Sequence, residues 1–75
     1  MMKREKYVYA TYDAKDVFET AKVTAKVRSI IKNLDGNRIS KEHDLDTKKI
    51  TYQIRTDDVS IITSLSSLPE VSVSM

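Results

Sequence analysis

The order of the hydrophobic patterns constrains this chain more than any other feature. A strand-like segment is followed by a helical pattern, two more strand-like segments, a second helical pattern and a final alternating segment. All six fit into 75 residues, and the only glycine (Gly36) and the only proline (Pro69) follow the two helical patterns. The sequence therefore predicts the element order βαββαβ in a single domain that spans residues 1–75.

The first strand segment, residues 6–12, is apolar on both faces. Tyr7 and Tyr9 share one face, and the other face carries Val8, Ala10 and Tyr12. Two apolar faces are typical of a strand at the centre of a sheet that is covered on both sides. In the alternative interpretation, the two tyrosines stay half-exposed because their hydroxyl groups can remain in water.

Residues 13–34 form the first helical pattern, in which apolar side chains fall on two opposite arcs. One arc holds Val17, Phe18, Ala21 and Ala25, and the other holds Val23, Val27, Ile30, Ile31 and Leu34. Either the first turns are separate or kinked, or one arc contacts a partner. A strand over residues 21–28 is disfavoured because alanine and lysine form helices better than strands.

The helix ends have their own signals. Asp16 followed by Glu19 predicts an N-terminal cap, and Asp35-Gly36 predicts a left-handed exit from the first helix. Residues 56–58, Thr-Asp-Asp, place acceptors at the start of a second helix built on Ile61, Ile62, Leu65 and Leu68. Pro69 then stops that helix, and Val71, Val73 and Met75 alternate with serines in a last strand.

Residues 38–45 and 49–56 predict a hairpin in the middle of the chain. In the second arm, Ile50, Tyr52 and Ile54 alternate with Thr51, Gln53 and Arg55. The first arm has only Ile39 and Leu45 as apolar anchors, with Lys41 and His43 between them, which favours an edge strand.

These elements together predict an α+β fold, the ferredoxin-like βαββαβ two-layer sandwich. Its four strands form one antiparallel sheet with the first and third strands at the centre, and both helices cover the same face. This fold hosts many unrelated functions, so it does not by itself indicate one.

Composition removes several kinds of site. The chain has no cysteine and a single histidine, which excludes disulfides and thiolate zinc sites. It has no 18-residue apolar run and no signal peptide, so we expect a cytoplasmic location. A chain of this length buries a small core, and without a disulfide a partner chain is the expected source of further stability.

Two polar clusters are candidates for a metal site or a catalytic site. Glu42, His43, Asp44 and Asp46 are the densest group of metal ligands, but a solvated hairpin end accounts for them. Asp13, Asp16 and Glu19 are explained by helix-start chemistry without a substrate. The sequence therefore predicts no enzyme activity, no metal and no cofactor, and it identifies no small-molecule ligand.

The chain resembles ACT-type regulatory domains over essentially its whole length. The resemblance lies in the strand that ends at Tyr12, Asp13 at the turn, the hairpin, and the segment 65–71, Leu-Ser-Ser-Leu-Pro-Glu-Val. Among such domains it looks most like the soluble C-terminal domain of the MgtC/SapB family of bacterial membrane proteins, a family associated with magnesium transport. Amino-acid-binding ACT domains usually have glycine just after the first strand, where this chain has Ala14 and Lys15. No ligand residues are therefore carried over.

Two functions from different classes follow as expectations. The first is a non-catalytic regulatory or dimerisation domain, a homodimer that a parent transmembrane protein tethers to the inner face of the cell membrane. The alternative is a small nucleic-acid-binding protein that uses the open sheet face, although the near-neutral charge of +2 and the missing RNA-recognition motif disfavour it. The candidate interface on the open face consists of Tyr7, Tyr9, Thr51, Gln53 and Arg55. For the homodimer, edge pairing that continues the sheet is the alternative contact.

Overall fold

The computed structural model describes residues 6–75. Its elements in chain order are β1 (Lys6–Asp13), α1 (Val17–Ile31), the 3₁₀ turn η1 (Gly36–Arg38), β2 (Ile39–Asp44), β3 (Lys49–Thr56), α2 (Val59–Ser66) and β4 (Val71–Ser74). The predicted βαββαβ order is confirmed, and so is the ferredoxin-like α+β architecture.

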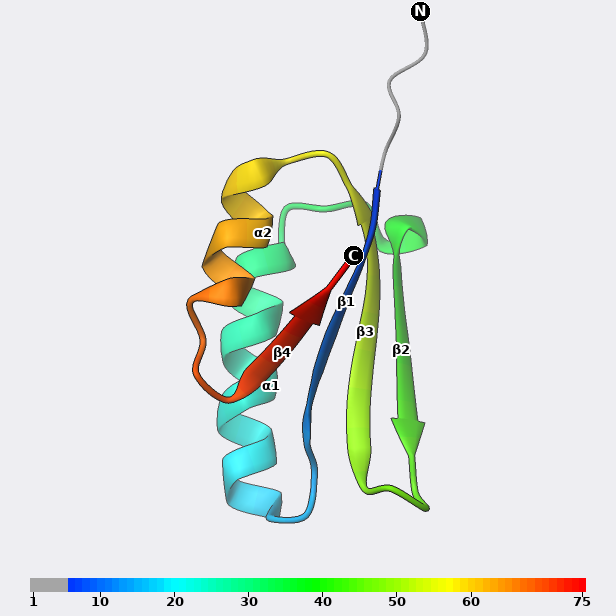
Figure 1. Cartoon of the computed structure of the whole chain (residues 1–75), viewed down its shortest axis with the longest axis vertical. Helices are drawn as coiled ribbons and strands as arrows, with labels where there is room; N and C mark the ends of the chain where they lie inside the picture. The colour runs from blue at the N-terminus through cyan, green and yellow to red at the C-terminus, as the bar shows by residue number, and fades with distance from the viewer. Residues whose placement is uncertain (1–5) are drawn as a thin grey trace, which may run out of the picture.

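The four strands form one antiparallel sheet in the order β2-β3-β1-β4. Both helices lie on one face of this sheet, and within residues 6–75 no layer covers the other face (Figure 1). The long β1–β3 ladder places Val8 opposite Ile54 and Tyr12 opposite Ile50. β1 and β3 are therefore central, as their two-sided and alternating patterns predict.

The core lies between the sheet and the helices, and its members are almost fully shielded from solvent. They are Val8, Ala10 and Tyr12 of β1, Ile50, Tyr52 and Ile54 of β3, Val23, Val27 and Ile31 of α1, Leu65 of α2 and Val71 of β4. Inside this layer the rings of Tyr12 and Tyr52 stack with their centroids 6.3 Å apart. Burial raises the pKa of Tyr12, whose hydroxyl stays satisfied by a 2.6 Å hydrogen bond with Thr24 Oγ1.

α1 is one continuous helix, so the interpretation of its first turns as a separate element is wrong. The arc of Val23, Val27 and Ile31 faces the core, whereas Val17 and Phe18 are each 80% exposed. The Asp16 cap is confirmed, because its carboxylate accepts hydrogen bonds from the amides of Phe18 (2.9 Å) and Glu19 (3.1 Å).

The expected left-handed exit at Gly36 is wrong. α1 ends at Ile31, followed by Lys32 in a right-handed conformation, and the amide of Leu34 donates to the Ile31 carbonyl at 3.0 Å. Gly36 begins η1 and does not have a positive φ. Within residues 6–75 the one non-glycine residue with a positive φ is Lys48 (54°), in the β2–β3 turn. α2 likewise ends at Ser66, before Leu68-Pro69.

β2 is an edge strand, as predicted, but Leu45 does not anchor it. The strand ends at Asp44, and Leu45 lies in the turn with 76% of its surface exposed. Lys41 and His43 pair with Tyr52 and Ile50 and therefore point toward the helix side, yet both are exposed. The two helices pack over β1 and β4 and leave β2 uncovered.

Replacing Ile54 with Asp should unfold the domain, because Ile54 is completely buried between Val8 and Ile39. An unpaired buried charge costs several kcal/mol, against a total stability of about 5–10 kcal/mol for a small domain. Thermal denaturation followed by circular dichroism measures the effect. The matched control is Gln53→Asp, one residue away on the open face, which should retain a cooperative transition. Equal melting temperatures for Ile54→Asp and wild type would contradict this core.

The free energy of unfolding should fall in acid because two carboxylates are tied into turns. Hydrogen bonds from the Ser60 hydroxyl (2.7 Å) and amide (2.9 Å) lower the pKa of Asp58, and amides of Thr47 and Asp46 lower that of Asp44. A lowered folded-state pKa contributes stability that is present above the ordinary value of 3.8 and lost as pH falls through the folded value.

Asp58→Asn keeps a capping oxygen but cannot titrate, so it should flatten this acid dependence. Urea unfolding between about pH 6 and pH 3 measures it. Asp57→Asn, which removes a neighbouring carboxylate outside the cap, should keep the wild-type slope. Identical slopes for wild type and Asp58→Asn would show that the cap does not contribute.

Candidate interaction surface on the open sheet face

All five residues predicted for the interface lie on the face of the sheet that the helices leave open. β-pairing sets Tyr7 opposite Arg55 and Tyr9 opposite Gln53. Tyr7 is 49% and Tyr9 37% exposed, and the remaining three, Thr51, Gln53 and Arg55, are half-buried. The two central strands thus bring the five side chains onto one continuous surface.

The backbone under this surface belongs to the most extensively paired part of the sheet. Every residue of β1 from Lys6 to Asp13 has a partner in β3. Between the strands the hydroxyls of Thr11 and Thr51 are 3.1 Å apart and share a hydrogen bond on this same face. Side chains held by a regular ladder are better positioned for recognition than side chains on loops.

Two shallow hollows adjoin Gln53 on this face. One, of about 160 Å³, is lined by Tyr7, Asn37, Arg38, Ser40, Gln53 and Arg55. The other, of about 150 Å³, is lined by Tyr9, Ser40, Lys41, Glu42, Thr51 and Gln53. Small-molecule sites usually enclose about 300–1,000 Å³, so each hollow is closer in size to a single side chain than to a ligand.

The charges on this face are mixed in sign. By strand register, Arg55 and Lys49 share it with three carboxylates, those of Asp13, Glu42 and Asp44. A surface that follows nucleic acid gathers basic residues to neutralise phosphates. This face does not gather them.

Sequence reasoning missed the contribution of the edge strands and of η1 to this face. Ser40 and Glu42 pair with Gln53 and Thr51, and Ser72 and Ser74 pair with Thr11 and Tyr9, so all four lie on the open side. The sequence could have predicted these four residues, because alternation in each edge strand sets its polar residues on the same face as the polar residues of the central strands. Asn37 and Arg38 lie in η1 and line the hollow beside Tyr7, and no pattern in the sequence predicted this turn.

In the two polar clusters considered as chemical sites, Asp44 and Asp13 accept hydrogen bonds from backbone amides. Asp44 accepts hydrogen bonds from the amides of Asp46 (2.9 Å) and Thr47 (3.3 Å), which fold the hairpin turn. His43 points to the opposite side of β2 from Glu42 and Asp44. Asp13 accepts from the Lys15 amide at 3.0 Å. In the described part of the chain no three His, Cys, Asp or Glu residues gather where they could hold a metal ion.

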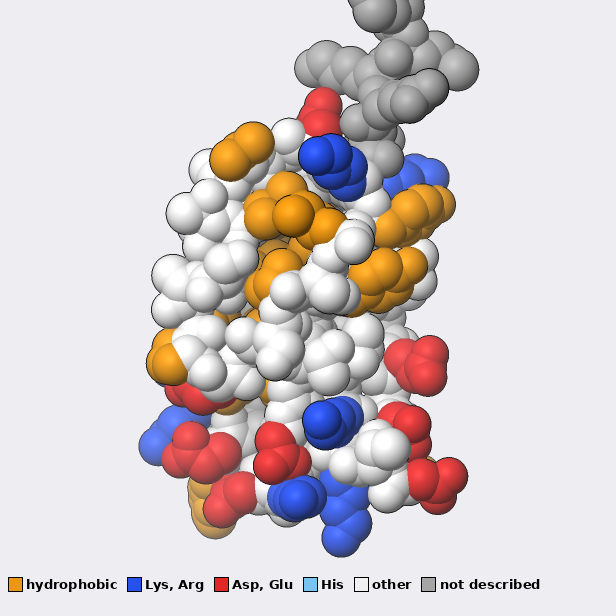
Figure 2. All heavy atoms as spheres, in the orientation of Figure 1, with side chains coloured by type: hydrophobic (Ala, Val, Ile, Leu, Met, Phe, Trp, Pro, Cys, Tyr) orange, Lys and Arg blue, Asp and Glu red, His pale blue; other side chains and the backbone are white. Residues whose placement is uncertain are grey.

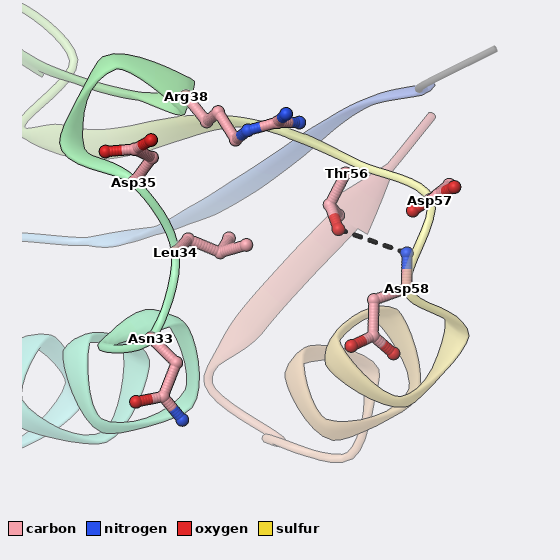
Figure 3. Close-up of a pocket in the computed structure, with 7 residues that line it drawn as sticks. All are labelled: Asn33, Leu34, Asp35, Arg38, Thr56, Asp57 and Asp58. Atoms are coloured by element: carbon pink, nitrogen blue, oxygen red, sulfur yellow. Dashed lines mark hydrogen bonds between the residues drawn. The ribbon is translucent and has the colours of Figure 1, made fainter. Parts of the chain in front are cut away.

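A larger hollow of about 700 Å³ lies at the end of the molecule where α1 exits and α2 begins. It is lined by Asn33, Leu34, Asp35, Arg38, Thr56, Asp57 and Asp58 (Figure 3). The Thr56 hydroxyl accepts a hydrogen bond from the Asp58 amide at 3.1 Å, and the Asp58 carboxylate caps α2. These groups therefore stabilise the start of α2, which leaves the open sheet face as the stronger candidate.

Searches with the chain against family models, curated proteins and solved structures return no significant match. Neither α1 nor α2, the two α-helices of residues 6–75, is long and apolar enough to cross a membrane.

Proposed function

We propose that this domain is a non-catalytic self-association module that pairs with a second copy through the open face of its sheet. The observation that supports this most directly is the pair of half-exposed tyrosines on the central strand, at a face that no other element of the described chain covers. In the space-filling view, apolar side chains gather in the upper half, over α2, β4 and the open side of the sheet, while most of the charged side chains lie in the lower half (Figure 2).

The open face is suited to a two-fold contact because it carries both projections and hollows. In a two-fold interface the same surface meets itself, so it must be self-complementary. Tyr7 and Tyr9 project from β1, and the two hollows beside Gln53 have about the volume of a side chain. Tyrosine is also the kind of residue that dominates binding energy at interface centres.

The proposal extends to the parent protein. A regulatory domain of the ACT type, like the C-terminal domain of MgtC/SapB membrane proteins, would use such pairing to transmit a signal between two copies. Sequencing the gene tests this part by itself. Membrane-spanning segments encoded upstream would support it, and an isolated gene for this domain would reject it without affecting self-association.

Sedimentation equilibrium from micromolar to submillimolar concentration tests the pairing. Wild type should exceed the monomer mass of 8.6 kDa as concentration rises. Tyr7→Ser/Tyr9→Ser should weaken the association at least about tenfold, because tyrosine anchors contribute a large share of interface energy. A monomer mass at every concentration would reject the proposal.

The chain offers a matched control in Val17→Ser/Phe18→Ser, which removes two apolar side chains that are even more exposed but lie at the start of α1. That variant should associate like wild type. If it dissociates while the tyrosine variant does not, the contact lies on α1 and the open face is the wrong surface.

A further inference from the structure

A groove runs between α1 and β2 on the helix side of the sheet, because the helices do not extend over the edge strand. It encloses about 300 Å³ and is lined by Arg28, Ile31, Lys32, Leu34, Ile39 and Tyr52. Its floor is apolar, with Ile31 and Tyr52 from the core and the partly buried Leu34 and Ile39 packed against them. The alternation of charges in β2 predicts an edge strand but not this groove, which depends on where α1 packs.

The α1 wall of the groove is basic, because Arg28 and Lys32 line it. Beyond the groove, Lys41 and His43 are set on the same side of the sheet by their pairing with Tyr52 and Ile50. The salt bridges within residues 6–75 involve Lys22 and Lys26, so Arg28, Lys32 and Lys41 have no carboxylate partner there. The carboxylates of β2, by contrast, point to the open face. Positive charge is therefore concentrated on one side of this strand.

The outer edge of β2 is also free to pair. Within the described sheet β2 is bonded to β3 alone, so one row of its backbone amide and carbonyl groups faces outward. Such a row is a template for an additional strand.

A second copy of this chain fits that edge poorly. When the β2 strands of two copies pair antiparallel about a two-fold axis, their helix-facing side chains lie on the same side of the joined sheet. In the two registers with the longest overlap, Lys41 then lies opposite either Lys41 or His43 of the copy. The second register also opposes two Glu42 side chains. Like charges directly opposite one another destabilise a strand pair. The same charges that reject a copy select a partner of complementary charge.

We propose that the β2 edge and the adjoining groove bind, by strand addition, an extended segment of another protein that is acidic on its helix-facing side only. Its acidic side chains lie on the helix side, opposite Lys41 and His43, and an apolar side chain opposite Ile39 enters the groove beneath Arg28 and Lys32. On the other side, basic or uncharged side chains face Glu42 and Asp44. This site does not depend on the open-face pairing proposed above.

The charge order of β2 specifies the probe. A fluorescein-labelled peptide of sequence Lys-Glu-Lys-Glu-Thr-Val, antiparallel to β2, places glutamates opposite His43 and Lys41 and valine opposite Ile39. Its control, Glu-Lys-Glu-Lys-Thr-Val, has the same composition but sets like charges opposite Lys41, Glu42 and Asp44. Fluorescence anisotropy should show tighter binding of the first peptide, and NMR shifts should map to β2 and the facing side of α1.

Lys41→Glu should weaken binding of the first peptide by about tenfold and strengthen binding of the control, because it converts an attraction into a repulsion. Lys41 is exposed, so this variant should fold. Lys22→Glu changes the net charge equally but lies outside the groove, and it should leave both affinities unchanged. This exchange of preference is a result that unfolding cannot produce.

Three results would overturn the proposal: no binding of either peptide, equal binding of both, or NMR shifts confined to Tyr9 and Gln53 on the open face. A fluorescein-labelled oligouridylate provides the comparison with another polyanion. If the oligonucleotide binds, Lys41→Glu abolishes that binding and neither peptide binds, the groove recognises phosphate and not a chain segment. That result would likewise overturn the proposal.

Discussion

The antiparallel ladder between β1 and β3 is the interaction on which the other elements depend. It joins the two eight-residue strands over their whole length and sets Val8 against Ile54 in the centre of the core. α1 and α2 pack on the buried side of this ladder, and the edge strands attach to its two flanks. The exposed side of the same ladder carries Tyr7 and Tyr9, so one set of backbone hydrogen bonds positions both the core and the candidate surface.

A second constraint is that the two helices of this domain do not cover all four strands. α1 and α2 lie over β1 and β4, and the small core that results leaves β2 without a helix. Ile39 is therefore only partly buried, while Lys41 and His43 remain in water on the side where a core residue would otherwise lie. Because no helix lies over β2, the groove beside α1 stays open and the side chains of this edge strand stay exposed.

Alternation and capping made much of this fold predictable. The sequence of β3 alternates without exception, and the structure buries Ile50, Tyr52 and Ile54 while Thr51, Gln53 and Arg55 stay on the open face. The register of β1 against β3 then brings the five candidate residues together. Asp16 capped α1 as expected, because a carboxylate at that position satisfies amides that have no partner within the helix.

The failures occurred where packing decided between local options. Gly36 was expected to end α1 in a left-handed conformation, but a tight turn through Leu34 ends the helix and buries part of that side chain. Leu45 was expected to anchor β2, but it lies in the β2–β3 turn, beyond the part of the hairpin that packs on the core, and is exposed. The hollow between Tyr7 and Arg55 was not predicted because it depends on where η1 sets Asn37 and Arg38 relative to the sheet.

The two surfaces left free differ in what they can select, and the difference comes from charge. On the open face Arg55 and Lys49 are balanced by nearby carboxylates, so a copy of the same face can approach without large repulsion. On the helix side of β2, Lys41 has no carboxylate partner within residues 6–75, so this side disfavours a copy and favours a segment with acidic side chains opposite Lys41. Because the sheet alternates its side chains, Glu42 and Asp44 contribute to one surface and Lys41 and His43 to the other. One short edge strand therefore contributes to two surfaces of opposite selectivity, the open face proposed for self-association and the helix side proposed for a different partner.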